Sequence, residues 1–146
     1  MRQTHGAPGV PGAPGVPDAT GAPAPLPPPA LLDGRPVDPK ELRALALTGY
    51  GHFTTLRVEG GRVRGLDLHL ERLTRDGRAL FGTAPDPGRV RELLRRSLAL
   101  YEGTTVGEPP AVTVRVTVFD PALDIARPDA ADRPAVLVTP VSYTHL

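Results

Sequence analysis

Arg72 is the side chain in this sequence whose type and position best suit it to bind an anion. With about 100° of rotation per helical residue, it shares one flank of a predicted helix with His69 and Asp76, beside the apolar stripe. An arginine there can hold two oxygens of a phosphate or carboxylate at once, which a lysine cannot do. It can also cover apolar surface and pair with Asp76 four residues later. Spacing alone favours this second role.

A second group of candidate binding residues lies in the strand that precedes this helix. Because side chains alternate along a strand, Phe53, Thr55 and Arg57 share one face. If that face lines a cleft, it can contact a small anionic ligand; if it faces solvent, it is an ordinary wet strand surface. Arg115 in a later strand has the same ambiguity. Arg127, in the loop before the last strand, is either a pocket residue or a solvated one.

The elements that position these residues are a hairpin and a helix. Residues 53–59 have the alternation and the β-branched side chains of a strand, and a Gly-Gly pair at 60–61 can supply the positive φ values of a two-residue turn. Residues 62–66 are predicted to form the returning strand. Leucines at helical spacing then predict an amphipathic helix over 67–81, with Gly77 at a close packing contact.

The remaining segments complete one α+β domain. Asp38 and Asp86, each followed by proline, predict helices over 39–47 and 87–103. Further strands are expected at 111–119, which alternates as a half-buried strand does, and at 135–141. The order of elements predicts an antiparallel sheet with helices packed on one face.

The two ends of the chain differ in composition from this domain, which we place at residues 31–141. Residues 1–30 are rich in proline and glycine and contain the repeat GAPGVPGAPGVP, so we expect a disordered leader. Residues 142–146, SYTHL, are unlike the preceding sequence, and we interpret them as an artefactual tail.

Composition argues against several classes of function. The 146 residues contain 17 lysines and arginines against 16 aspartates and glutamates, so no charge excess points to nucleic acid or to a membrane surface. With no cysteine and four scattered histidines, a metal site is not indicated. No apolar run approaches the roughly 18 residues that span a bilayer, and no secretory signal is evident. We expect a cytoplasmic protein.

The segment from Gly49 to Leu73, GYGHFTTLRVEGGRVRGLDLHLERL, resembles the N-terminal signature of the class-IV, or fold-type-IV, pyridoxal-phosphate enzymes. This family includes aminotransferases and aminodeoxychorismate lyases, and GHFTTLRV followed by HLERL is most similar to the lyase-like members. The resemblance covers about residues 31–141, the small N-terminal domain of that fold. Thr54 stands where many members have glutamate, which argues against a branched-chain substrate.

The resemblance implies roles for particular residues. Arg72 matches the arginine that grips the cofactor phosphate, which reverses the preference from spacing alone. Phe53 and Thr55 match positions that face the substrate pocket, and Arg57 matches a basic position near that pocket or the dimer contact. Arg127 corresponds to a loop arginine that binds the substrate carboxylate in some members.

For the intact protein, the resemblance implies amino transfer or elimination on a small amino-acid or amino-chorismate-type substrate, with pyridoxal 5'-phosphate as cofactor and a homodimer as the assembly. The family's Schiff-base lysine belongs to a second domain, and the single lysine here, Lys40, gives no reason to assign it that role. We therefore expect this chain alone to be an inactive N-terminal half. The alternative is a non-enzymatic module that binds a phosphate ligand or mediates dimerisation.

Overall fold

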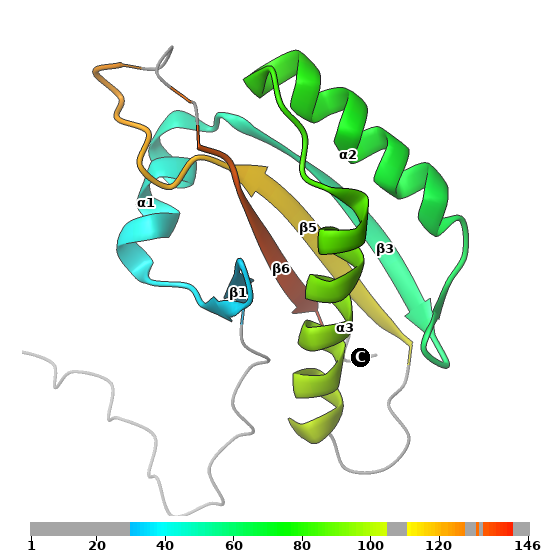
Figure 1. Cartoon of the computed structure of the whole chain (residues 1–146). Helices are drawn as coiled ribbons and strands as arrows, with labels where there is room; N and C mark the ends of the chain where they lie inside the picture. Colours follow the sequence, from blue (N-terminus) through cyan, green and yellow to red (C-terminus); the bar gives the residue numbers. More distant parts are fainter. Residues whose placement is uncertain (1–29, 105–110, 128–130, 132, 142–146) are drawn as a thin grey trace, which may run out of the picture.

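The computed structural model describes residues 30–104, 111–127, 131 and 133–141. The strands form one antiparallel sheet with the order β2-β1-β6-β5-β3-β4 (Figure 1). This confirms the predicted α+β class. The predicted tail 142–146, and the predicted leader apart from residue 30, lie outside the described residues. The elements are β1 (Leu31–Leu32), β2 (Arg35–Pro36), α1 (Pro39–Thr48), β3 (Gly51–Glu59), β4 (Arg62–Val63), α2 (Leu66–Phe81), α3 (Pro87–Thr104), β5 (Val112–Phe119) and β6 (Ala135–Val141).

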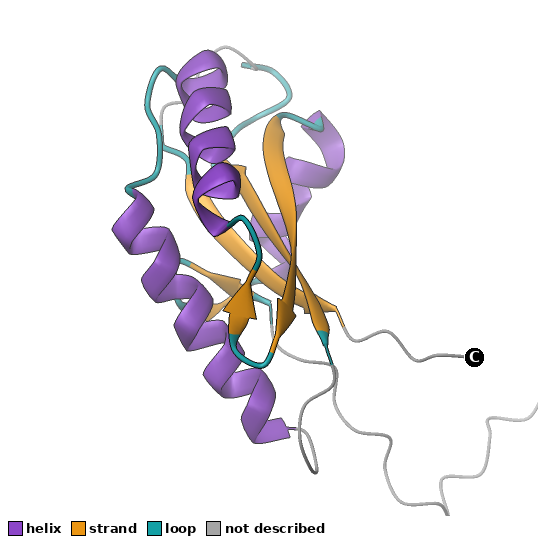
Figure 2. Cartoon of the chain, turned by 90° about the vertical axis from the view of Figure 1, so that its right-hand side faces the viewer, coloured by secondary structure: helices purple, strands orange, loops and turns teal. Residues whose placement is uncertain are grey.

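The main hydrophobic core lies between the sheet and two helices. Figure 2 shows α2 and α3 on one side of the strands, as the sequence predicted. Leu70 and Leu73 of α2 and Leu93 of α3 pack with the even-numbered valines of β5, of which Val114 and Val116 have no exposed surface. Burying these side chains away from water is the main stabilising contribution of this face.

α1 covers the other face of the sheet at one end, across the sheet from α3 (Figure 2). The prediction that the helices pack on one face therefore holds for α2 and α3 but not for α1. Leu42 and Leu45 of α1 pack against a second cluster formed by Leu32, Phe119, Ala135 and Leu137. The predicted half-burial of strand 111–119 is therefore wrong at its C-terminal end, because Thr117 and Phe119 are buried as well.

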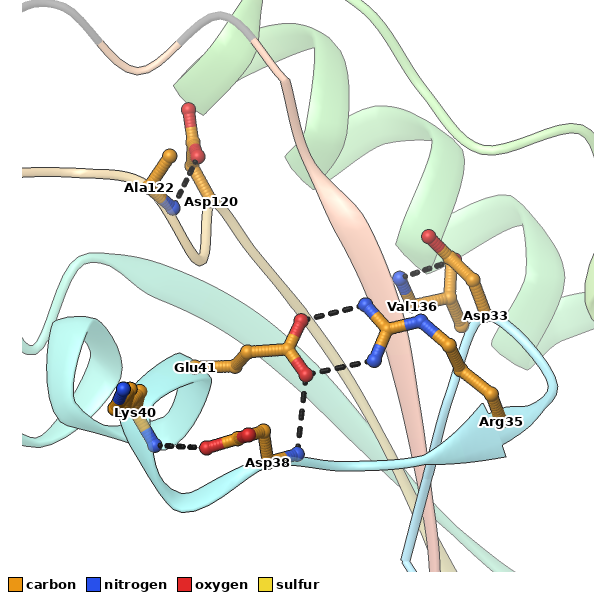
Figure 3. Close-up of polar contacts among 8 residues, drawn as sticks. All are labelled: Asp33, Arg35, Asp38, Lys40, Glu41, Asp120, Ala122 and Val136. Carbon is orange, nitrogen blue, oxygen red and sulfur yellow. Dashed lines mark hydrogen bonds and ion pairs between the residues drawn. The ribbon is translucent and has the colours of Figure 1, made fainter.

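Both predicted helix starts are confirmed. The side chain of Asp38 accepts a hydrogen bond from the Lys40 backbone N–H at 2.9 Å, and the Glu41 carboxylate accepts one from the Asp38 N–H at 3.0 Å (Figure 3). Arg35 also donates two hydrogen bonds to Glu41, and these bonds lower the pKa of Glu41 to about 2. Asp86 begins α3 by accepting a hydrogen bond from a backbone N–H in its first turn at 2.9 Å.

The β3–β4 hairpin forms at the predicted turn. Gly60 and Gly61 have φ values of 56° and 72°, a left-handed conformation that favours glycine. The prediction of a strand over 62–66 is wrong beyond Val63. Gly65, with a φ of 68°, ends the extended run, and α2 begins directly after it at Leu66.

A second hairpin, β1–β2, was not predicted. It turns at Asp33 and Gly34, whose φ values are 49° and 88°. The backbone N–H of Asp33 donates to the Val136 carbonyl at 2.9 Å, and the Val136 N–H donates to Asp33 Oδ1 at 3.0 Å (Figure 3). These two bonds hold the hairpin against β6. β1 pairs with β6 and so extends the sheet beyond that strand.

Candidate functional site

Arg72 lies on the flank of α2 that faces away from α3. The opposite flank, which includes Asp67, Thr74 and Arg78, lines a cavity of about 590 Å³ together with Arg91 of α3. Arg72 is not among the residues lining that cavity. Since residues three and four apart share a helix face, Arg72 lies with His69 and Asp76, as the helical spacing predicted.

The guanidinium group of Arg72 is only weakly engaged within the chain. Its Nε lies 3.7 Å from Asp76 Oδ2, and 59% of the side chain is exposed. Arg75 competes for the same carboxylate at 3.2 Å. Because an exposed ion pair at this distance contributes little, the planar N–H donors of Arg72 remain available for the two oxygens of an anion.

A hydrogen bond fixes this flank of α2 over β3. Thr54 Oγ1 lies 2.8 Å from His69 Nδ1, and Thr54 is buried on the covered face of the strand. His69 precedes Arg72 by three residues, so this bond helps to set the rotation of the helix segment that carries Arg72.

His52 is a buried polar residue at the same interface, and the sequence prediction did not single it out. Its ring centroid lies 6.0 Å from that of Phe81, and neither ring nitrogen has a hydrogen-bond partner among the described residues. Burial lowers the pKa of His52, and the negative charge of Asp76 partly opposes that shift. In the sequence, His52 lies two residues before Thr54 and four before Leu56, so strand alternation could have placed it on the same, core-facing side.

The predicted common face of Phe53, Thr55 and Arg57 is confirmed, and the face is open. These three residues are exposed, whereas the residues between them are buried. Arg115 of β5 lies directly opposite Thr55, and its guanidinium carbon is 3.7 Å from the Phe53 ring centroid. This cation–π contact places the Arg115 guanidinium over the aromatic ring. Arg115 therefore belongs to the open face, which the sequence alone did not decide.

The Arg72 flank and the open face lie on the two opposite sides of β3. β4 pairs with β3 only at Val58 and Glu59, and no described strand pairs with the same side of residues 51–57. α2 lies along β3 (Figure 1). Arg72 is on the flank of α2 opposite the one that lines the cavity shared with α3. Residues 51–57 of β3 therefore have an edge that is not covered by a described strand, with α2 on one face and the open face on the other.

The structure does not group Arg127 with Arg57. Arg127 is exposed in the loop after β5, where its backbone N–H donates to the Asp124 carbonyl at 2.9 Å. Since Gly51 pairs with Phe119, this loop follows the Gly51 end of β3, whereas Arg57 lies near the hairpin at the other end.

This arrangement defines a class of protein: an α+β domain that carries an exposed arginine on α2 and a mixed aromatic and cationic face on β3. The family model for amino-transferase class IV matches residues 51–146. The chain belongs to this family. The matched region contains the hairpin, α2 and the open face of the sheet.

The fold also matches a solved structure, described as a hypothetical aminotransferase from Mycobacterium tuberculosis in its PLP-bound form. The two are 22% identical, with a TM-score of 0.52 over 77% of this chain. The match covers only 38% of the mycobacterial chain. Comparison with curated proteins found no significant match. No helix in the described part of the chain is long and apolar enough to cross a membrane.

Proposed function

We propose that this chain is the N-terminal half of a cytoplasmic, homodimeric enzyme that uses pyridoxal 5'-phosphate to transfer or eliminate the amino group of a small amino acid or an amino-chorismate-type acid. The observation that carries this proposal is the weakly paired Arg72 guanidinium within the HLERL segment of a class IV family member. When bound, the cofactor supplies the electron sink for amino-group chemistry.

The residues present suit the cofactor's phosphate. Arg72 offers parallel N–H donors from a helix whose rotation is set by the His69–Thr54 hydrogen bond. Its interaction with Asp76, at 3.7 Å, is long enough to be replaced by a phosphate oxygen. In this proposal Arg72 binds the phosphate and fixes the position of the cofactor relative to the edge of β3.

The open face of the sheet would form one wall of the substrate pocket. Phe53, 46% exposed, would exclude water from the reacting centre, while Thr55 and Arg57 would contact the substrate. Arg115, held on the Phe53 ring, adds a cation that can bind a carboxylate. Arg127 would contact a carboxylate from the loop at the other end of β3.

No residue that the structure describes is assigned as the amine that reacts with the cofactor. Lys40 lies in the first turn of α1 and is exposed. α1 packs on the second cluster, away from the flank of α2 that carries Arg72. We therefore propose that the complete protein supplies this lysine from a further domain, and that the 146-residue chain alone is inactive.

The test compares two neighbouring arginines in protein expressed from the complete gene. Arg72→Gln is expected to weaken pyridoxal 5'-phosphate binding by about tenfold or more, because charged hydrogen bonds contribute roughly 1.5–3 kcal/mol. Arg75→Gln is the matched control, since Arg75 lies on the same helix and contacts the same Asp76. Equal losses in the two variants, or equal binding of pyridoxal and its phosphate ester, would contradict the proposed role of Arg72.

Product analysis separates the possible reactions. A transaminase passes the amino group to a keto acid acceptor, whereas a lyase-like enzyme releases pyruvate without one. The lyase-like reaction is preferred because Thr54 and the GHFTTLRV segment are similar to those members.

A non-enzymatic phosphate-binding or dimerisation module is the second candidate. It is favoured by one observation, that the exposed guanidinium of Arg72 is already presented by this chain alone. Phosphate-ester binding through Arg72, with no conversion of any amino acid by protein from the complete gene, would support this alternative.

A further inference from the structure

Asp120, the first residue after β5, is a buried carboxylate that no role described above uses. It is only 3% exposed. Its Oδ1 accepts a hydrogen bond from the Ala122 backbone N–H at 2.9 Å (Figure 3), and its Oδ2 accepts one from the Arg133 N–H at 3.1 Å. Burying a carboxylate is costly unless such bonds compensate for the lost water. The two oxygens of one side chain therefore tie together the beginning and the end of the loop between β5 and β6.

Two consecutive turns connect Asp120 to Arg127. In the first, the Leu123 N–H donates to the Asp120 carbonyl at 3.2 Å, and Leu123 is buried. In the second, the Asp124 side chain accepts from the Ala126 N–H at 3.1 Å, and the Asp124 carbonyl accepts from the Arg127 N–H at 2.9 Å. Aspartate favours such turns because its side chain bonds to the backbone two residues later. The position of Arg127 thus depends on a turn that starts at Asp120.

The loop runs beside α1 (Figure 1), and residues 121–125 line a cavity of about 360 Å³ together with residues of that helix. α1 itself packs on Phe119, which strand alternation puts on the same side of the sheet as Arg115. Phe53 pairs with Thr117, two residues before Phe119. The loop therefore adjoins the end of the open face that carries Phe53.

We propose that Asp120 is a positioning residue for substrate: by tying both ends of the loop, it holds Arg127 where the guanidinium contacts the substrate carboxylate. The contact of Arg127 with substrate rests on the proposed function, whereas the dependence of the loop on Asp120 does not. Without this carboxylate, the Ala122 and Arg133 N–H groups lose their acceptor, and the loop gains conformations that it must give up when a carboxylate binds. Such an ordering cost lowers affinity.

Hydrogen exchange tests the loop in protein expressed from the complete gene, resolved at single residues by mass spectrometry with peptide fragmentation. The Ala126 and Arg127 amides bond to Asp124 rather than to Asp120. In Asp120→Ala they should nevertheless exchange about tenfold faster or more, because the first turn no longer restrains the second.

Asp86→Ala is the matched control for this measurement. It also removes an aspartate that accepts a backbone N–H at 2.9 Å, but at the start of α3. The Ala126 and Arg127 amides should exchange at the wild-type rate in this variant. Unchanged exchange in folded Asp120→Ala, or an equal increase in the two variants, would overturn the proposal.

Asp120→Asn provides a graded variant, which also serves if Asp120→Ala fails to fold. The amide keeps one acceptor oxygen and replaces the other with an NH₂ group, so it can accept from Ala122 or from Arg133 but not from both. Exchange at Ala126 and Arg127 should lie between the rates of wild type and Asp120→Ala. Wild-type exchange in Asp120→Asn would contradict the requirement that both ends of the loop be tied.

A carboxylate probe separates this inference from the proposed function. DL-Alanine and DL-alaninamide differ in the carboxylate, and titrating each into the cofactor-loaded enzyme while following the cofactor absorbance gives the preference for the carboxylate. Arg127→Gln should lower this preference about tenfold and Asp120→Ala about three- to tenfold, with unchanged affinity for pyridoxal 5'-phosphate. The double variant should lose no more than Arg127→Gln alone, because Asp120 acts through Arg127.

The outcomes of the probe experiment are distinct. Additive losses in the double variant would overturn the positioning role of Asp120. If Arg127→Gln keeps the wild-type preference, the proposed contact of Arg127 with the carboxylate fails, and hydrogen exchange still decides whether Asp120 holds the loop.

Discussion

The two faces of β3 are built from alternate residues of the same nine-residue strand, yet they serve different purposes. On the covered face, Leu56 and Val58 are buried against α2 and α3. On the open face, Phe53, Thr55 and Arg57 are exposed. Fold stability therefore depends on one set of side chains, while the neighbouring set is exposed and forms the wall that we propose for the substrate pocket. Substitutions at adjacent positions separate these two contributions.

The largest expected effect comes from Leu56→Ala. Leu56 is 1% exposed, and removing its side chain leaves a cavity in the core, so the free energy of unfolding should fall by roughly 2–5 kcal/mol. Thr55→Ala, one residue away on the open face, should change it by about 0.5 kcal/mol or less. Urea denaturation of both variants measures the difference. Similar losses at the two positions would mean that the open face is also part of the stabilising core.

Two glycines extend the comparison to the helices that cover the sheet. A Cβ at Gly77 of α2 would lie 2.9 Å from the Thr83 carbonyl oxygen and 3.1 Å from Ala84 Cα, whereas a Cβ at Gly103 of α3 would meet no atom within 4 Å. Gly77→Ala should therefore lower the melting temperature, with a net cost of roughly 1–2 kcal/mol, because backbone atoms cannot easily move away.

Gly103→Ala should raise stability by up to about 1 kcal/mol, because alanine favours the helix. Thermal unfolding followed by circular dichroism compares the two variants. Stabilisation by both substitutions would show that α2 has room to shift, and that the predicted close contact at Gly77 does not restrict it.

The smallest expected effect concerns the one histidine buried on the covered face of β3. Burial lowers the pKa of His52 in the folded state, so the unfolded chain binds a proton more readily. Stability should be fully present above the ordinary histidine pKa of about 6.5, and should fall as the pH drops below it through the folded pKa. His52→Leu should make this decline shallower. Parallel stability curves for wild type and variant between about pH 8 and pH 5 would exclude a contribution from His52.

The two hairpins show how far the sequence predicts the fold. The β3–β4 turn was predicted because a Gly-Gly pair interrupts a long alternating strand. The β1–β2 hairpin was missed although Asp33-Gly34 is a strong turn signal, since its two-residue strands are too short to show alternation. Their pairing depends on β6, about a hundred residues away, which local sequence patterns do not reveal.

The candidate site was predictable to the extent that periodicity determines it. Helical spacing placed Arg72 on a flank with His69 and Asp76, and strand alternation placed Phe53, Thr55 and Arg57 together. The contact of Arg115 with Phe53 depends on the register of two strands that are far apart in sequence. The cavity beside the β3–β4 hairpin, which is lined by Arg57, Glu59, Arg62, Val63 and Arg64, depends on where β4 ends. That end was predicted three residues too late.

The hydrogen bonds between Asp33 and Val136 (Figure 3) also limit when the sheet can be completed during synthesis of the chain. They join residues 103 positions apart, and at a synthesis rate of about 5–20 residues per second the ribosome needs roughly 5–20 s to make the chain between them. During that interval β1 has no strand to pair with at its β6 side. We therefore expect the β1 edge of the sheet to be completed late in translation, after the hairpin and α2 have already been synthesised.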